Sequence, residues 1–138
     1  MLDTTTAWGR LADRRLREEQ VIWLTTVRRD GQPQPTPVWF LWDGRSILIY
    51  AQPNQQKLRN IRHNPRVSLH LNTDARGDSV VRIDGVAELV RDGPPATAVP
   101  QFTDKYRAGM QRIGTDPEDF ARDYSVAIRV VPQRFYGW

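Results

Sequence analysis

The sequence predicts an α+β fold that is mainly β: a small, closed or partly closed barrel of six antiparallel strands with flanking helices. Three observations support this class. Short segments rich in β-branched and aromatic residues recur along the chain, Asp-Gly pairs separate several of them, and segments with helical spacing lie before and between them. The 138 residues form one expected domain, 1–138, which is long enough to bury a core without covalent cross-links.

The N-terminal part predicts an amphipathic helix followed by an antiparallel meander. Apolar residues recur at helical spacing within residues 6–20. These residues are Trp8, Leu11, Ala12 and Leu16. Three strand-like segments follow, and an Asp-Gly pair after each of the first two favours a tight hairpin. The expected strands are 21–27, 36–42 and 46–51, with turns at Asp30-Gly31 and Asp43-Gly44.

The rest of the chain predicts three strands and three helical segments. Asn54 is expected to cap a helix at 54–63 by accepting a bond from a free N–H group. Asp84-Gly85 lies inside the apolar segment 79–90 and suits either a third hairpin or a bulge. We favour the bulge because the arms of a hairpin would be short. The remaining expected elements are strands at 66–71 and 124–138, a helix at 95–112, and a short helix from Pro117 to Phe120.

Composition and charge limit the classes of function. The net charge of +4 suits an anionic partner. The chain has no cysteine, and its two histidines, His63 and His70, lack the spacing of metal ligands, so we expect no metal. No apolar stretch approaches the roughly 20 residues that span a membrane, and we expect a cytoplasmic protein with no membrane partner. A nucleic-acid module ranks last, because no aromatic cluster accompanies the basic residues.

The stretch YAQPNQQKLRN, residues 50–60, contains the first candidate site. Between Asp43 and Asp74 there is no acidic residue, and Lys57 is one of only two lysines in the chain. Its place in the first turn of the predicted helix puts a cation beside free N–H groups and the positive end of the helix dipole. We expect a phosphate to occupy this position; the alternative is an exposed lysine with no role.

Most of the chain resembles a known family. The segments WLTTVRRDGQPQPTPVWFLWDGRSILIYAQPNQQKLRNIRHNPRVSLHL, DGVAELV and YSVAIRVVPQRFYGW resemble the split β-barrel flavin-binding proteins related to pyridoxamine 5'-phosphate oxidase. The resemblance is closest to their actinobacterial branch of reductases that depend on a deazaflavin, coenzyme F420. It implies a six-stranded antiparallel split β-barrel and a homodimer whose site lies at the subunit interface.

The resemblance also implies which cofactor binds. In the oxidases, four basic groups hold the phosphate of FMN. Laid over this chain without a gap, they fall on Pro35, Phe40, Gln56 and Lys57, so only Lys57 is basic. One cation suits the phosphodiester of F420, which carries one charge, better than the phosphomonoester of FMN, which carries about two. Arg59 and Arg62, or basic groups of a second subunit, would meet the acidic tail of F420.

The ring site follows from the same resemblance. The expected cofactor-binding residues are Thr36, Pro37, Val38, Trp39, Tyr50, Ala51, Gln52, Gln56 and Lys57. The backbone of 36–40 and the indole of Trp39 would lie along the tricyclic ring, although aromatic residues on a barrel strand more often belong to the core. Trp39 and Trp42 are three residues apart, so one of them is expected to point outward or into an interface.

The end of the chain contains the candidates for the substrate side. Arg134, Tyr136 and Trp138 recur at a spacing of two and share one face of a strand. They either close the rim of the barrel or form one wall of the substrate cavity.

The resemblance implies an oxidoreductase that uses reduced coenzyme F420 to transfer hydride to a small, electron-poor acceptor. The alternatives are an FMN-dependent oxidase or reductase, and a protein that binds F420 or haem without turnover. No catalytic side chain is assigned, because the cofactor itself supplies the chemistry of hydride transfer.

Overall fold

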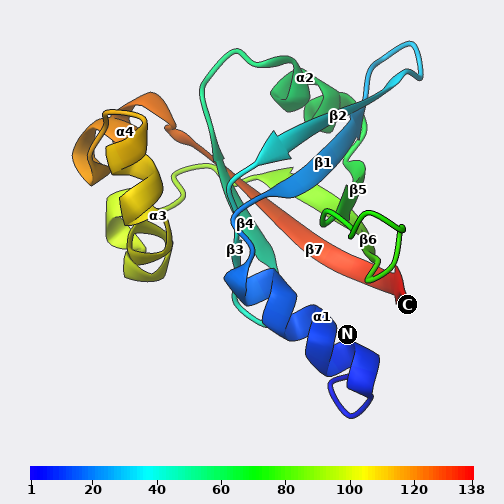
Figure 1. The fold of residues 1–138 in the computed structure, drawn as a ribbon. Helices are drawn as coiled ribbons and strands as arrows, with labels where there is room; N and C mark the ends of the chain where they lie inside the picture. The colour runs from blue at the N-terminus through cyan, green and yellow to red at the C-terminus, as the bar shows by residue number, and fades with distance from the viewer.

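A single antiparallel sheet and four α-helices make up the fold in a computed structural model that describes residues 1–138 (Figure 1). The seven strands have the order β2-β1-β5-β6-β7-β4-β3. They are β1 (Ile22–Val27), β2 (Pro33–Val38), β3 (Leu41–Trp42), β4 (Ile47–Ala51), β5 (Arg66–His70), β6 (Val81–Leu89) and β7 (Val126–Gly137). The helices are α1 (Ala7–Glu18), α2 (Gln56–His63), α3 (Pro100–Arg112) and α4 (Pro117–Asp123), with a 3₁₀ turn, η1, at Ala96–Ala98.

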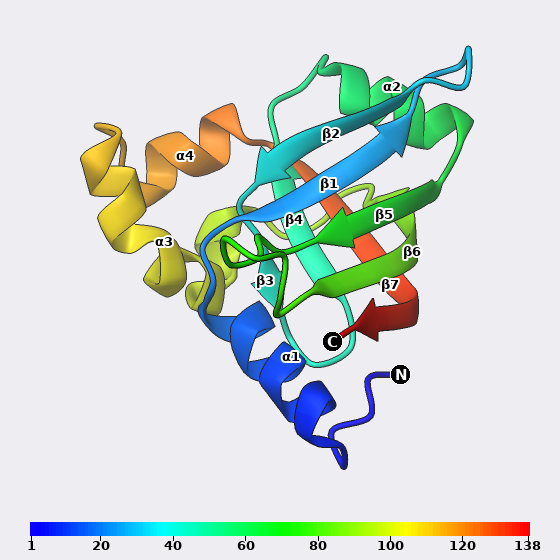
Figure 2. The same ribbon diagram turned by 45° about the vertical axis from the view of Figure 1, so that its right-hand side comes forward.

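The prediction of six strands is wrong, because the segment expected to form one strand at 36–42 is divided in two. β2 pairs with β1 and β3 pairs with β4, so the two lie at opposite edges of the sheet. Only Trp39 and Phe40 separate them in sequence. The sheet therefore curls until its edges approach each other, as Figure 2 shows. Both hairpins at the Asp-Gly pairs, β1–β2 and β3–β4, are confirmed.

The division of the strand has a physical cause at Phe40, whose peptide groups bond to helix α3 instead of to a neighbouring strand. The Phe40 N–H donates to the hydroxyl of Tyr106 at 2.8 Å. The hydroxyl proton is shared between the carbonyl oxygens of Phe40, at 2.9 Å, and Gln20, at 2.8 Å. The ammonium of Lys105 also donates to the Phe40 carbonyl at 2.9 Å and lies 3.9 Å from the centroid of the Phe40 ring. Both backbone groups of Phe40 are thus hydrogen-bonded although the residue is buried.

The main core fills the inside of the curled sheet. In β1 every second residue is buried, as expected of a strand with one face toward a core. Helix α1 contributes Ala12 and Leu16, and α2 contributes Leu58 and Ile61, so these helices close the barrel with their apolar faces. Trp42 belongs to this core, and its indole N–H donates to Asp13 at 2.9 Å.

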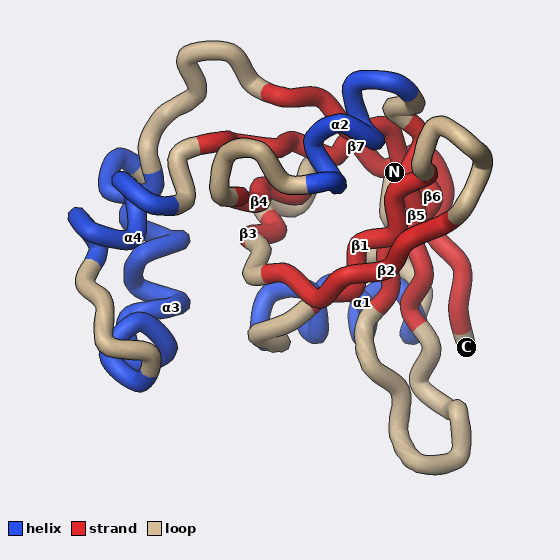
Figure 3. Tube along the Cα trace, turned by 90° about the horizontal axis from the view of Figure 1, so that it is seen from above, coloured by secondary structure: helices blue, strands red, loops and turns tan.

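A second, smaller core joins α3 and α4 to β4 and β7. Its buried residues include Tyr50, Phe102, Tyr106, Met110 and Phe120. Figure 3 shows the two helices standing beside the sheet rather than across its mouth. Trp39 packs against this core while Trp42 lies in the other, so within this chain neither tryptophan has the outward orientation that the sequence predicts for one of them.

The bulge favoured at Asp84-Gly85 is confirmed. β6 continues through both residues, and its pairing with β7 changes register there: Asp84 faces Arg134 while Gly85 faces Pro132. A Cβ atom at Gly85 would lie 2.8 Å from a methyl carbon of Val130 and 3.0 Å from the Val131 carbonyl oxygen. Glycine is therefore required where the two backbones come closest.

The Lys105 contact predicts a particular dependence of stability on pH. Burial lowers the pKa of Lys105 from 10.5 to about 8, and the nearby charge of Glu19 only partly opposes this. Between these values the unfolded chain binds more protons than the folded one, so the free energy of unfolding should rise with pH. We expect the rise that Lys105 contributes between pH 7.5 and 9.5 to be about 1 kcal/mol, since some solvent still reaches the ammonium.

Urea unfolding of the wild type and of Lys105→Met across this window measures the effect. The methionine variant keeps most of the side-chain volume and should lack this part of the rise. The window ends below pH 10 because burial raises the pKa of Tyr106, whose ionisation in the unfolded chain lowers stability above that pH. Parallel curves for the two proteins would contradict the prediction.

Candidate functional site

An apolar groove of about 340 Å³ opens beside the break between β2 and β3. β2 and the residue after it supply Pro37, Val38 and Trp39, and the end of β4 supplies Tyr50 and Ala51. Gln55 and Lys57 enter from the start of α2. The opposite wall consists of Ile113, Phe120 and Tyr124, and Val21 completes the lining. Below, "the groove" means the space lined by these residues.

Lys57 is the one charged residue of the groove. Its side chain is half-buried, and burial alone lowers the pKa of its ammonium below the usual 10.5. None of the ion pairs of the chain includes it. A partly desolvated cation without a counter-charge favours an anionic ligand, because the ligand would replace the hydration that burial removes.

Helix α2 begins beside this cation without a side-chain cap. Gln55 occupies the N-cap position, and its side chain accepts no bond from the first turn. The prediction that Asn54 caps the helix is wrong: Asn54 lies two residues before the helix and has a positive φ of 68°. The first turn contains no acidic residue either. Its N–H groups and the helix dipole therefore act in the same place as the Lys57 charge.

A second, polar hollow of about 710 Å³ adjoins the groove. Gln55 and Lys57 line both spaces and so mark their junction. The other residues of this polar hollow come from the β1–β2 hairpin and from α2. They are Thr26, Gln32, Pro33, Gln34, Pro35, Thr36, Gln56 and Asn60. The two spaces together offer an apolar part and a polar part with one cation between them.

Hydrogen bonds fix most of the polar hollow and leave one group free. The side-chain amide of Asn60 donates to Thr26 and to Gln34, both at 2.9 Å, and accepts from Gln56 at 2.8 Å. The hydroxyl of Thr36, by contrast, is buried without any partner. A buried hydroxyl without a partner is destabilising, so a ligand that bonds to it would gain free energy.

Aromatic contacts hold the apolar wall. The indole of Trp39 stacks on Tyr106, with ring centroids 4.6 Å apart and planes 8° apart, and on Phe120 at 5.6 Å and 19°. Phe120 stacks in turn on Tyr124 at 4.4 Å. The hydroxyl of Tyr50 donates to the Pro94 carbonyl at 2.7 Å, which turns it away from the groove's ligand-binding groups. The wall is therefore a column of stacked aromatic rings, and it gives one side of the groove an apolar, aromatic lining.

The structure brings most of the sequence-predicted cofactor residues to these two spaces. Pro37, Val38, Trp39, Tyr50, Ala51 and Lys57 line the groove, while Thr36 and Gln56 line the polar hollow. Gln52 lines neither; it is exposed, and its side-chain oxygen accepts a bond from Gln55 at 3.2 Å.

The residues predicted for the substrate side lie elsewhere. Arg134, Tyr136 and Trp138 are exposed and line neither space. Arg134 donates to the Tyr136 hydroxyl at 2.6 Å, and the guanidinium of Arg82 lies 4.1 Å from the Tyr136 ring centroid. Figure 1 places the C-terminus at the end of the molecule away from α2 and α4. Within one chain, these side chains do not meet the groove.

Sequence reasoning missed the wall that α3 and α4 provide. Ile113, Phe120 and Tyr124 were not among the expected site residues, although Phe120 and Tyr124 lie four apart, the spacing of neighbours on a helix. A third hollow, of about 490 Å³, lies on the outer side of α2 and contains Arg29, Arg59, Arg62 and His63. This hollow brings Arg59 and Arg62, which are expected near the acidic tail of F420, together with Arg29.

Two further features concern metals and membranes. No group of three or more histidine, cysteine or acidic side chains is arranged to hold a metal ion. Among the helices, none combines the length and the apolar character that crossing a membrane requires.

Solved structures with the same fold include three informative ones. An F420 reductase is 30% identical, with a TM-score of 0.72, over 90% of this chain and 94% of that chain. A conserved hypothetical protein from Mycobacterium tuberculosis is 26% identical, with a TM-score of 0.70, over 96% of this chain and 84% of that one. The heme storage protein HutZ from Vibrio cholerae shares the fold at 19% identity and a TM-score of 0.61, over 93% and 89% of the two chains.

A comparison with protein families matches residues 11–138 to the family described as pyridoxamine 5'-phosphate oxidase. The match begins within α1 and includes every strand of the sheet, the groove and the polar hollow. The chain therefore belongs to the pyridoxamine 5'-phosphate oxidase family of split-barrel proteins that bind flavins or deazaflavins.

Proposed function

We propose that this chain is an oxidoreductase that binds reduced coenzyme F420 in the groove and the polar hollow and reduces a small, electron-poor acceptor in the cytoplasm. One observation carries the proposal: Lys57 is an unpaired, half-buried cation at the uncapped start of α2, where an aromatic groove and a polar hollow meet. The similarity to an F420 reductase at 30% identity supports the same cofactor.

The residues present fit such a coenzyme. The Lys57 ammonium, the free N–H groups of α2 and the partnerless Thr36 hydroxyl are three donors for one phosphodiester. Trp39, Phe120 and Tyr124 provide an apolar aromatic wall beside which a tricyclic ring would lie, shielded from water on that side. Arg29, Arg59 and Arg62 would meet an acidic tail on the outer side of α2.

The chemistry that the bound coenzyme supplies is hydride donation to an electron-poor acceptor. The protein contributes position and electrostatics: Lys57 and α2 fix the anionic part, and the aromatic wall fixes the plane of the ring. The titratable side chains that line the groove are Lys57, Tyr50 and Tyr124.

FMN fits less well because most of the positions that hold basic residues in the oxidases are not basic in this chain. Of the positions that hold basic residues in the oxidases, Pro35 is an exposed proline of β2 and Phe40 lies fully buried beneath Tyr106. The side chain of Gln56 is bonded to Asn60. Lys57 is thus the single cation available to a phosphomonoester that carries about two charges.

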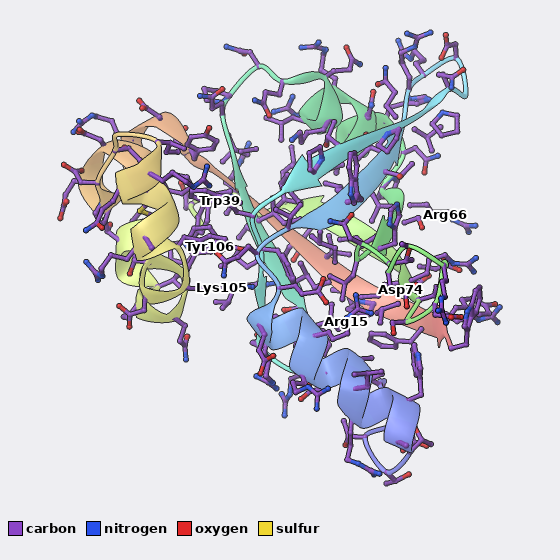
Figure 4. The ribbon with its side chains drawn as sticks, viewed as in Figure 1. Arg15, Trp39, Arg66, Asp74, Lys105 and Tyr106 are labelled. Atoms are coloured by element: carbon purple, nitrogen blue, oxygen red, sulfur yellow. The ribbon has the colours of Figure 1, made fainter.

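We expect Lys57→Ala to weaken F420 binding by roughly 1.5–3 kcal/mol, the range for a hydrogen bond to a charged group. Arg66→Ala is the matched control, because it removes a cation from the exposed face of β5 away from the groove (Figure 4). Tryptophan quenching on titration with F420, FMN and haem side by side reports the affinities. Wild-type binding of FMN or haem but not of F420 would overturn the proposal, and so would unchanged F420 affinity in Lys57→Ala.

The proposed contact between Lys57 and F420 also predicts that the affinity for F420 depends on pH. Burial lowers the pKa of Lys57 in the free protein, and a bound anion would raise this pKa again. Where the free amine has lost its proton, binding of the anion must therefore be accompanied by uptake of a proton, which weakens binding as the pH rises. F420 affinity should therefore fall as the pH rises through the lowered pKa of Lys57 toward 10.5. In Lys57→Arg the charge persists throughout this range, and the protein contribution to the fall should disappear. An equal fall in both proteins would assign it to the coenzyme instead.

A homodimer is the second part of the proposal, because Arg134, Tyr136 and Trp138 would reach a groove only from a second copy. One row crosses four neighbouring strands in register: the half-buried Trp23 and the exposed His70, Arg82 and Tyr136. Trp23 stacks on His70 with centroids 6.2 Å apart. In β2 the partner of Trp23 is Pro37, which lines the groove, so a copy that covers this row also borders the groove.

Light scattering at micromolar concentration is expected to give about twice the chain mass of 16.0 kDa. Tyr136→Glu should shift the mass toward one chain, because it replaces an aromatic contact at the interface with a carboxylate that loses its hydration there. Gln101→Glu, which adds the same charge on the exposed side of α3, should leave the mass unchanged. A monomeric wild type that binds F420 would show that the site is built within one chain.

A further inference from the structure

Trp39 is held from behind by helix α3. Its indole lines the groove, while the two residues that support it, Tyr106 and Gly109, do not. Tyr106 gives its ring to the stack and its hydroxyl to the peptide of Phe40, the next residue in the chain. Figure 4 shows Trp39, Tyr106 and Lys105 together where α3 meets the sheet. The position of the indole is therefore set in part by residues outside the ligand-binding space.

Gly109 makes the close approach of the indole to α3 possible. It lies inside the helix, where alanine would be the more favourable residue. A Cβ atom there would lie 3.2 Å from both Cη2 and Cζ2 of Trp39, a contact so tight that the indole would have to move by a few tenths of an ångström. Tyr106 and Phe120 stack on the ring and Trp39 lines the groove, so a displaced indole would change the shape of the groove.

We propose that Gly109 is a positioning residue that determines the width of the groove, and so the thickness of the planar ligand that it admits. Without a side chain at 109, the indole sits back against α3 and the groove accepts a tricyclic ring. Any larger residue would push the indole forward and select against such rings. The inference rests on the proposed function for the identity of the ligand, but not for the position of Trp39.

A double-mutant cycle tests the inference with variants Gly109→Ala, Trp39→Phe and the two combined. The first readout needs no ligand. Five tryptophans give five indole N–H signals in a nitrogen–proton correlation spectrum, and Trp39→Phe identifies the signal of Trp39 by its loss. Gly109→Ala is expected to shift this signal more than the other four. A Trp39 signal that stays in place would overturn the inference.

The second readout is affinity, measured for F420 and for anilinonaphthalene sulfonate, a dye with fused rings and one negative charge. Gly109→Ala should bind both about tenfold more weakly, because the displaced indole narrows the groove. The helix propensity of alanine offsets part of the cost of the tight contact, so the variant should stay folded. Gln111→Ala, on the exposed side of α3, is the control for that helix effect and should bind like the wild type. In the Trp39→Phe background, adding Gly109→Ala should change affinity less than twofold.

Equal losses in both backgrounds, or unchanged affinity in Gly109→Ala, would overturn the role of Gly109 in groove width. The dye allows the role of Gly109 to be tested separately from the proposed function. If the wild type binds the dye but not F420, the proposed function fails, and the cycle with the dye still decides whether Gly109 acts through Trp39. Loss of dye binding in Lys57→Ala assigns the dye signal to the groove.

Discussion

The Tyr106 hydroxyl on the Phe40 peptide is the contact on which the arrangement of the molecule depends. A curled sheet must change direction between β2 and β3, and there the backbone loses the partners that a strand would provide. The chain is buried at this point, so an unpaired N–H or carbonyl would be costly. Tyr106 and Lys105 satisfy both groups from α3. One tyrosine thereby allows the barrel to close, attaches the helical pair and supports Trp39.

The candidate site differs from the rest of the interior because it contains polar and charged groups without partners. Elsewhere buried polar groups have partners, as Asn60 does with Thr26 and Gln34. At the start of α2, a cation without a counter-charge, an uncapped turn and a free hydroxyl lie around one junction. Each is individually weak as a sign of ligand binding. Their convergence matters because all three favour the same chemistry, an anion of low charge.

The sequence predicted the fold class, both Asp-Gly hairpins and the bulge at Asp84-Gly85. These depend on local rules of turn chemistry and strand alternation. It did not predict the break at Phe40, because the residues that satisfy the break, Lys105 and Tyr106, lie about sixty-five positions further along the chain. For the same reason the groove wall at Phe120 and Tyr124 was missed. Lys57 could be found because its rarity and its place in a helix are both local.

The two walls of the groove belong to separate cores and should differ in their resistance to local unfolding. One wall belongs to the barrel, with its core of 21 buried residues, and the other to a helical pair whose core has 7. The smaller unit has less buried surface to resist local opening, so its amides should exchange with solvent through partial unfolding while the barrel remains intact. A ligand that contacts both walls ties the two units together. Part of its binding free energy is then spent on suppressing this motion, and the occupied protein becomes the more rigid one.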